Sequence, residues 1–186
     1  GVYPTIEILN GTSVPKNLGG SKTKSAFLSL LSNVQYNYDQ KYMAQASFRR
    51  DGSSRFGANK RFGNFYSFGI SWALHRESFM KSVDFVDHLK FRGSYGSVGN
   101  ANISDFVAHG IYNMTVQYDG VPGGFPRRIA NPDLTWESNY NTNLAIDGGL
   151  FSRINFSIDL YSKKTVNLLQ NVPLPMVSGY YWFTDN

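Results

Sequence analysis

The sequence predicts an all-β fold, and three observations support this prediction. Six segments alternate apolar and polar residues with a period of two, which is the pattern of a strand with one apolar and one polar face. Short and long connections alternate between these segments. Aromatic residues make up 16% of the chain, yet only 41% of its residues are hydrophobic. This composition is typical of strands that carry their apolar surface in every second residue.

The alternation places the six strands in chain order. The first lies within residues 25–38, and a three-residue turn at 39–41 leads into the second. The fifth and sixth strands are joined by another three-residue turn at 151–153. The apolar residues of the six runs are Val34, Tyr36 and Tyr38; Tyr42, Ala44, Ala46 and Phe48; Tyr66, Phe68, Ile70, Trp72 and Leu74; Leu89, Phe91, Gly93 and Tyr95; Leu144, Ile146 and Leu150; and Ile154, Phe156, Ile158 and Leu160.

The connections alternate in length, and their order predicts the architecture. Outer-membrane barrels have short turns at one rim and long loops at the other, whereas a soluble sandwich has no reason to alternate so regularly. No run of about 20 apolar residues marks a helical membrane span. The sequence therefore predicts an antiparallel transmembrane β-barrel. Phe79, Met80, Val83 and Val86 have the spacing of a short amphipathic helix in the third connection. The connections are residues 39–41, 51–64, 77–88, 100–134, 151–153 and a long segment from 170 onward.

The sixth strand shows the two faces most clearly. In a membrane barrel, alternate side chains face lipid and lumen. We expect Ile154, Phe156, Ile158 and Leu160 to face lipid, and Asn155, Ser157 and Asp159 to face the lumen.

Four segments carry recognisable signatures, and they occur in one order along the chain. They read Arg49-Arg50-Asp51-Gly52-Ser53-Ser54-Arg55-Phe56-Gly57; Leu89-Lys90-Phe91-Arg92-Gly93-Ser94-Tyr95-Gly96-Ser97-Val98-Gly99-Asn100; Asn131-Pro132-Asp133-Leu134-Thr135-Trp136-Glu137; and Asp159-Leu160-Tyr161-Ser162-Lys163-Lys164-Thr165. In these segments the chain closely resembles the SusC/RagA-type TonB-dependent transporters of the bacterial outer membrane. The resemblance covers roughly residues 25–179.

The resemblance implies a particular fold and function. Members of that family have a barrel of about 22 strands, a size associated with a plugged lumen. An N-terminal plug fills the barrel, and a TonB box couples it to the inner-membrane proton gradient. A SusD-like surface lipoprotein commonly caps the barrel, and the cargo is typically an oligosaccharide or a peptide. We therefore expect TonB-energised nutrient import across a bacterial outer membrane, with TonB, a SusD-like lipoprotein, lipid and lipopolysaccharide as partners.

The chain carries about six strands of such a larger barrel. Six strands cannot close the barrel and would leave two bare edges, which are untenable in lipid. We therefore expect residues 1–186 to be part of one barrel domain, with the plug and the remaining strands absent from this chain. Two alternatives remain open at this point, namely a soluble all-β carbohydrate-binding module and a passive outer-membrane porin.

The sequence contains no catalytic motif that stands above chance. His75, His88 and His109 lack the spacing of zinc ligands, and the chain has no cysteine. Ser78 and Lys81 fit an SxxK pattern, but its companion motifs are missing. We therefore expect no enzymatic activity, no metal and no cofactor.

The segment from Arg49 to Arg61 contains five basic residues, interleaved with Phe56 and Phe62. Such a mixture suits nucleic-acid binding. It equally suits a solvated hairpin tip, or an electrostatic contact with lipopolysaccharide phosphates or the plug. Because only this short segment is basic in a chain of net charge +5, we favour the last two interpretations and expect no nucleic-acid partner. Arg50, Asp51 and Arg55 are further expected to pair with one another.

Candidate cargo-binding residues gather in and just beyond the long connection at 100–134. Outer loops of transporters meet cargo and lid, and planar aromatic and hydrogen-bonding side chains suit a sugar or a peptide. An alternative is a loop that merely packs on its neighbours. The candidates are Tyr112, Tyr118, Asp119, Arg127, Arg128 and Trp136.

Overall fold

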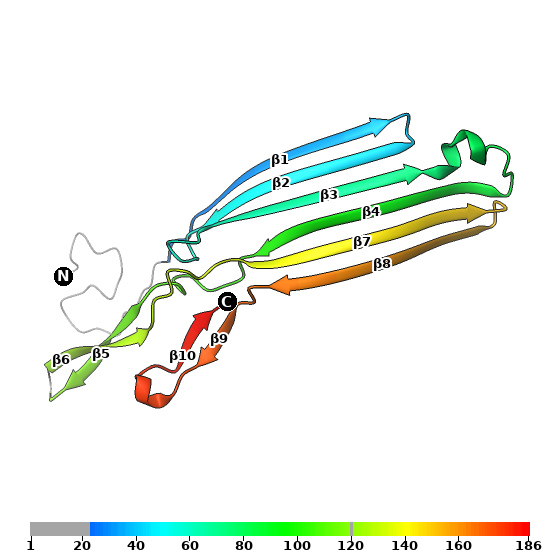
Figure 1. Ribbon diagram of the computed structural model, residues 1–186. Coiled ribbons are helices and arrows are strands. Elements are labelled where there is room, and N and C mark those ends of the chain that lie inside the picture. Colours follow the sequence, from blue (N-terminus) through cyan, green and yellow to red (C-terminus); the bar gives the residue numbers. More distant parts are fainter. Residues whose placement is uncertain (1–22, 120) are drawn as a thin grey trace.

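A single antiparallel sheet of six long strands makes up most of the protein (Figure 1). The computed structural model describes residues 23–119 and 121–186. The order of the large sheet is β1-β2-β3-β4-β7-β8, so each strand pairs with its neighbour in the chain except where the hairpin β5–β6 intervenes. The strands are β1 Phe27–Tyr38, β2 Tyr42–Ser53, β3 Phe62–Ala73, β4 Val86–Asn100, β5 Ile111–Tyr118, β6 Val121–Arg128, β7 Glu137–Leu150, β8 Ile154–Val166, β9 Gln170–Pro173 and β10 Trp182–Asp185.

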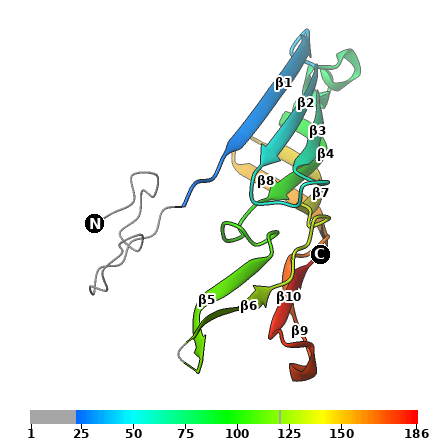
Figure 2. The same ribbon diagram turned by 90° about the vertical axis from the view of Figure 1, so that its left-hand side faces the viewer.

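The two ends of the sheet differ, as the lengths of the connections predict. The turns β1–β2 and β7–β8 lie at one end with the β3–β4 connection, and the hairpins β5–β6 and β9–β10 extend from the other (Figures 1 and 2). Both short turns have two residues with positive φ, Asp39 and Gln40 in one and Phe151 and Ser152 in the other. Positive φ at both central residues matches the right-handed twist of the flanking strands.

The β3–β4 connection departs from the expected amphipathic helix. It contains two short 3-10 helices, η2 Leu74–Arg76 and η3 Ser78–Met80, and Val86 already belongs to β4. An isolated helix of two or three turns is marginal in water. Here the connection is instead fixed at both ends by its neighbours. Glu77 accepts hydrogen bonds from Tyr42 and Trp72, and Ser152 donates two to Asp87.

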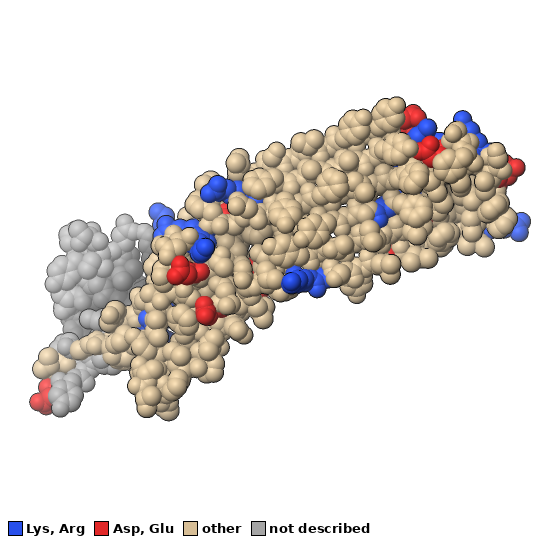
Figure 3. Space-filling model, in the orientation of Figure 1, with Lys and Arg blue, Asp and Glu red and all other residues tan. Residues whose placement is uncertain are grey.

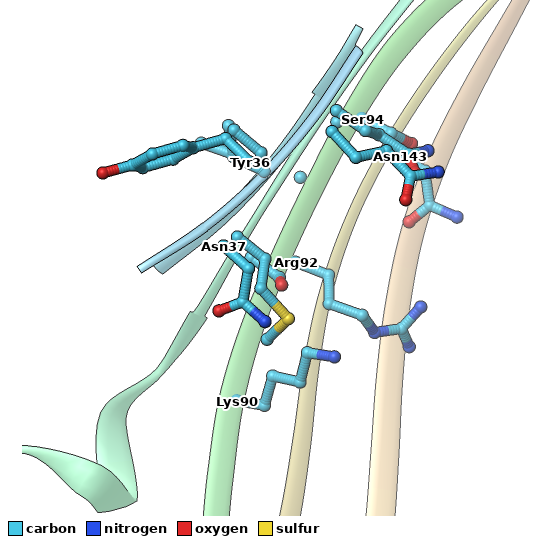
Figure 4. Close-up of a pocket in the computed structure, with 14 residues that line it drawn as sticks. Tyr36, Asn37, Lys90, Arg92, Ser94 and Asn143 are labelled. Carbon is cyan, nitrogen blue, oxygen red and sulfur yellow. The ribbon is translucent and has the colours of Figure 1, made fainter. Parts of the chain in front are cut away.

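The register places polar and apolar side chains mainly on opposite faces of the sheet. Residues directly opposite in an antiparallel pair lie on the same face. In Figure 4, Tyr36 points to the opposite side of the sheet from Arg92 and Asn143. The predicted alternation of β8 is confirmed. One row on the mainly polar face is Asn37, Met43, Ser71, Arg92, Ala145 and Asp159. The adjacent row on the apolar face is Tyr36, Ala44, Ile70, Gly93, Leu144 and Leu160.

The buried core lies beyond the long-connection end of the sheet. Trp136 is 3% exposed, and its ring centroid lies 4.5 Å from that of Phe56 and 5.5 Å from that of Phe65. Val107, Ala108 and Leu134 complete this cluster. The segment 100–134 is therefore not a plain loop, because it contributes core residues and the hairpin β5–β6. Among the described residues, no helix is long and apolar enough to cross a membrane.

Candidate functional site

Two of the signature segments pack directly against each other. Gly57 N donates a hydrogen bond of 2.9 Å to Leu134 O, and Asn59 N donates one of 3.1 Å to Pro132 O. A Cβ on Gly57 would lie 2.1 Å from the carbonyl oxygen of Pro132. Backbones come this close only where a side chain is missing. The β2–β3 connection and the segment just before β7 are therefore packed together at the rim of the sheet.

The charges of the basic segment are largely engaged within the fold. Arg49 Nε lies 2.7 Å from Oδ2 of the fully buried Asp51. This contact is an ion pair without hydrogen-bond alignment, since neither Asp51 oxygen accepts a hydrogen bond within the described part of the chain. Arg55 Nε donates a hydrogen bond of 2.7 Å to Asp105 Oδ1, in the connection between β4 and β5.

The expected pairing of Arg50, Asp51 and Arg55 with one another is therefore wrong. Asp51 pairs with Arg49 instead, and the Arg50 guanidinium carbon lies 5.2 Å from the ring centroid of Phe62. These cation–π and ion-pair contacts, together with Arg55–Asp105, hold the β2–β3 connection in place. A groove for phosphates would need these guanidinium groups free, so the arrangement weighs against nucleic-acid binding.

The third signature segment fixes the C-terminal hairpin. Asn131 Nδ2 donates hydrogen bonds of 3.1 Å to Thr184 O and to Asp185 Oδ1 in β10. Glu137 accepts one bond from Asn100 Nδ2, at 3.1 Å, and one from Leu169 N, at 3.4 Å. Asn131 and Glu137 therefore tie β4, β7 and the hairpin β9–β10 together.

The candidate cargo residues lie in different environments. Tyr112 and Asp119 are exposed on the hairpin β5–β6, and the side chain of Tyr118 lies outside the described ones. Arg127 and Arg128 line a small cavity of about 130 Å³ with Ile111 and with Trp182 of β10. Trp136 stands apart, since it is buried in the core and donates a hydrogen bond of 3.1 Å to Arg61 O.

The hairpins thus bring two arginines next to an indole that sequence reasoning did not single out. Arg128 Nη1 donates a hydrogen bond of 3.2 Å to Phe106 O, which fixes its direction, while Arg127 is exposed. Trp182 is 44% exposed and lies in a short strand more than 50 residues further along the chain. A guanidinium beside an exposed aromatic ring can bind a carboxylate or a hydroxyl and stack on a flat group.

The polar face of the sheet carries a charged cluster that the signatures did not indicate. Arg92 Nε and Nη2 donate hydrogen bonds of 2.6 and 2.8 Å to the two carboxylate oxygens of Asp147. Asp159 Oδ1 lies 3.6 Å from Arg92 Nη2, and Ser157 Oγ donates to Asp147 Oδ1 at 2.8 Å. The sequence contained one indication of this cluster, because its three charged residues occupy polar positions of neighbouring strands.

A shallow hollow of about 430 Å³ lies beside this cluster (Figure 4). Amide side chains and two cations line it, among them Gln35, Gln45, Lys90, Arg92 and Asn143. These polar groups can hydrogen-bond with water or with a polar partner, although Met43, Ala44 and Ile70 also line the hollow. Among the described residues, no group of three His, Cys, Asp or Glu side chains could hold a metal ion.

A family model described as TonB dependent receptor-like, beta-barrel, matches residues 2–185. The chain belongs to the TonB-dependent receptor β-barrel family. Within this family it is of the SusC/RagA type, as its signatures predicted. TonB-dependent receptor P39 of Formosa agariphila is 44% identical over 163 residues, which make up 87% of this chain and 16% of that protein. SusC of Bacteroides thetaiotaomicron is 31% identical over 166 residues, or 85% of this chain and 17% of SusC.

Solved structures of receptors in this family share the arrangement of the strands. The RagAB peptide importer in its closed-closed state matches with a TM-score of 0.81 and 29% identity, over 95% of this chain and 19% of that chain. Its open-open state matches with a TM-score of 0.80 and 28% identity. The predicted fold class is confirmed, since the sheet is an antiparallel part of a TonB-dependent receptor barrel. The chain covers less than a fifth of the length of these relatives.

Proposed function

We propose that this chain forms part of the wall and outer rim of a TonB-energised nutrient importer in a bacterial outer membrane, and that it catalyses no reaction. In this role residues 1–186 belong to one barrel domain, which further strands complete and a plug fills. Among the residues that the structure describes, no strand pairs with the outer edges of β1 and β8, and this supports the proposal because unpaired strand edges in lipid need partner strands.

The separation of the two faces carries the proposal. Two rows of aromatic side chains cross the apolar face of the sheet, and aromatic rings with a polar edge are enriched on the outer surface of membrane barrels near the interfaces. Tyr38, Tyr42, Trp72 and Phe91 form one row, with neighbouring centroids 6.3 Å apart. Tyr66, Tyr95 and Tyr140 form the other, with centroids 6.2 and 6.5 Å apart.

The lengths of the strands agree with a membrane span. The 12 residues of β1 extend about 37 Å at about 3.4 Å per residue. A tilt of about 45° reduces this to a height of about 26 Å, close to the apolar band of about 25 Å in such barrels. On the visible face of the sheet, charged side chains gather mainly towards its two ends (Figure 3).

Cargo binding is proposed for the hairpin β5–β6 and its neighbour β9–β10. Exposed Tyr112, Asp119 and Arg127, together with Arg128, provide the stacking and hydrogen-bonding groups that an oligosaccharide or a peptide needs. We also propose Tyr118 as a cargo-binding residue. Trp136 is buried, and its role is therefore packing. The same rim would meet a SusD-like lipoprotein. RagAB, which matches this chain, is a peptide importer.

The energy for import would come from TonB acting on the plug. The test is uptake of oligosaccharide or peptide by cells that produce the full-length protein, with and without the TonB system. We expect uptake to collapse in the TonB-deleted strain. Persistent uptake there would identify a passive porin, and a chain that stays monodisperse without detergent would identify a soluble binding module.

A further inference from the structure

Two hollows on the apolar face adjoin along β4, β7 and β8. The larger, of about 630 Å³, is lined mainly by apolar groups, among them Gly93, Leu144 and Leu160. The smaller, of about 360 Å³, lies further towards the long-connection end. It is lined by Tyr95, Tyr140, Thr142, Ser162, Lys164 and Val166.

The pairing shows that the hollows form one track. Leu144 is opposite both Gly93 and Leu160, and the next positions on the same face are Tyr95, Thr142 and Ser162. Tyr140 and Lys164, which are opposite each other, come two residues further on. Gly93 has no side chain, so the space between Ile70 and Leu144 stays open at this point of the track. The track therefore changes from hydrocarbon to hydroxyl groups and finally to a cation.

Lys164 is the unusual member of this track. Its backbone position places it on the apolar face, whereas Lys163, on the adjacent position of β8, lies on the polar face. The paired residues of β4, β7 and β8 include three acidic ones, and all of them lie on the polar face as well. They are Glu137, Asp147 and Asp159. Within the described residues, Lys164 forms no ion pair. A cation at a membrane interface without a protein counter-charge attracts an anion from its surroundings.

We propose that this track binds one phosphorylated lipid of the outer leaflet. The phosphate lies against the Lys164 ammonium, within reach of the Ser162 and Thr142 hydroxyls, and an acyl chain follows Leu160 and Leu144 towards Gly93. The proposal rests on the proposed function, because it needs the apolar face to meet lipid. Charge complementarity favours a phosphorylated lipid over the acyl anchor of a lipoprotein, because that anchor carries no anion that could pair with Lys164.

The test compares Lys164→Gln with Lys163→Gln in the full-length protein. The two variants lose the same charge from adjacent positions on opposite faces. Purified, delipidated protein in detergent is titrated with phosphorylated lipid A and with the same lipid after enzymatic removal of its phosphates, and binding is read by native mass spectrometry. We expect the wild type and Lys163→Gln to prefer the phosphorylated lipid, and Lys164→Gln to bind it about tenfold more weakly, as expected for one lost charge-assisted hydrogen bond.

Two outcomes would overturn the proposal. Equal binding of both lipids by the wild type would assign the track to acyl chains alone, including those of a lipoprotein. Equal losses in the two variants would show a general charge effect.

Uptake with and without TonB is measured in the same strains. Because that assay does not depend on lipid titration, failure of the import proposal and failure of the lipid site are distinguishable.

Discussion

Gly57 lies against the carbonyl of Pro132, so close that a Cβ would come within 2.1 Å of the oxygen. The two residues belong to signature segments that are separated by more than 70 residues in the chain. Their contact shows that the two segments pack together in the fold. One supplies a backbone without a side chain, and the other supplies the carbonyl groups that this backbone approaches.

Gly57→Ala should therefore disturb the outer rim. The added methyl group must displace backbone atoms rather than a flexible side chain, and overpacking of this kind costs about 1–3 kcal/mol. We expect lower resistance of the folded barrel to urea and faster proteolysis of the hairpins β5–β6 and β9–β10. Gly110→Ala is the matched control, because its nearest neighbours would lie 3.6 Å from the new Cβ. Equal effects of the two changes would contradict this role of Gly57.

The alternation of residues was sufficient to predict the large sheet, because a two-residue period determines which side chains share a face once one face is buried. The hairpin β5–β6 was not predictable in the same way. Its second strand, Val121–Arg128, contains two prolines and two glycines, which disfavour strands in local terms. Pairing with β5 overrides that local preference.

The burial of Trp136 illustrates a second limit. An aromatic residue in a loop can equally meet cargo or fill a core, and its local sequence does not distinguish the two. Here the answer depends on Phe56 and Phe65, which come from the β2–β3 connection and from β3. The cavity at Trp182 was missed for the same reason, since its lining comes from three separate segments.

The charged cluster on the polar face should stabilise the sheet through Asp147. Asp147→Asn replaces a carboxylate that accepts two hydrogen bonds from Arg92. We expect a lower free energy of unfolding, because two charge-assisted hydrogen bonds are lost, with an effect limited by the solvent exposure of the pair. Asp159→Asn should have a smaller effect, because its contact with Arg92 is a single one at 3.6 Å. A double-mutant cycle with Arg92→Gln in urea measures the coupling, and a coupling near zero for Asp147 would contradict the prediction.

The short-turn rim should become less stable in acid through Glu77. The pKa of Glu77 is lowered, chiefly by the hydrogen bond from Tyr42 and further by that from Trp72 and by the nearby Lys41 ammonium. A carboxylate with a lowered pKa in the folded state stabilises the fold above its ordinary pKa, and this contribution is lost as the pH falls through the folded-state pKa. The stability difference between wild type and Glu77→Gln should therefore be full at pH 7 and shrink in acid below pH about 4.

Asp84→Asn is the control for this measurement. Asp84 lies in the same connection but makes no hydrogen bond or ion pair within the described residues. Its replacement should leave the free energy of unfolding at pH 7 nearly unchanged. A difference between wild type and Glu77→Gln that persists at low pH would show that the carboxylate charge is not what stabilises this rim.

Shortening the hairpin β5–β6 should reduce uptake without preventing assembly. The deletion must remove paired residues of both strands, because removal of residues 110–124 alone would leave the rest of β6 without its partner. Ile111 is opposite Arg128, and replacing residues 112–127 by a two-residue turn keeps that pair. We expect weaker cargo uptake or weaker association with the lid lipoprotein, measured at equal amounts of inserted protein. Arg127→Gln is the milder variant, and normal uptake by both would remove the hairpin from cargo binding.

The orientation of the sheet in the membrane can be tested on two adjacent residues of β8. Ile158 lies on the apolar face and Ser157 on the polar face, where its hydroxyl is 2.8 Å from Asp147 and 3.1 Å from Asp159. Ile158→Arg would place a cation in the hydrocarbon region, at a cost of about 2–4 kcal/mol near mid-bilayer. Ser157→Arg would place the same cation beside two carboxylates. It is a better control than Asp159→Arg, because an arginine at position 159 would face Arg92, whose Nη2 now lies 3.6 Å from Asp159 Oδ1.

We expect Ile158→Arg to lower the amount of folded barrel in the outer membrane, and Ser157→Arg to assemble nearly as well as the wild type. Heat-modifiable migration on gels reports the folded fraction in each strain. The two substitutions share a strand, differ by one position and introduce the same side chain, so strand propensity and depth are nearly matched. A larger defect for Ser157→Arg would mean that the polar face meets lipid and the apolar face the interior, which would reverse the orientation of every strand in the sheet.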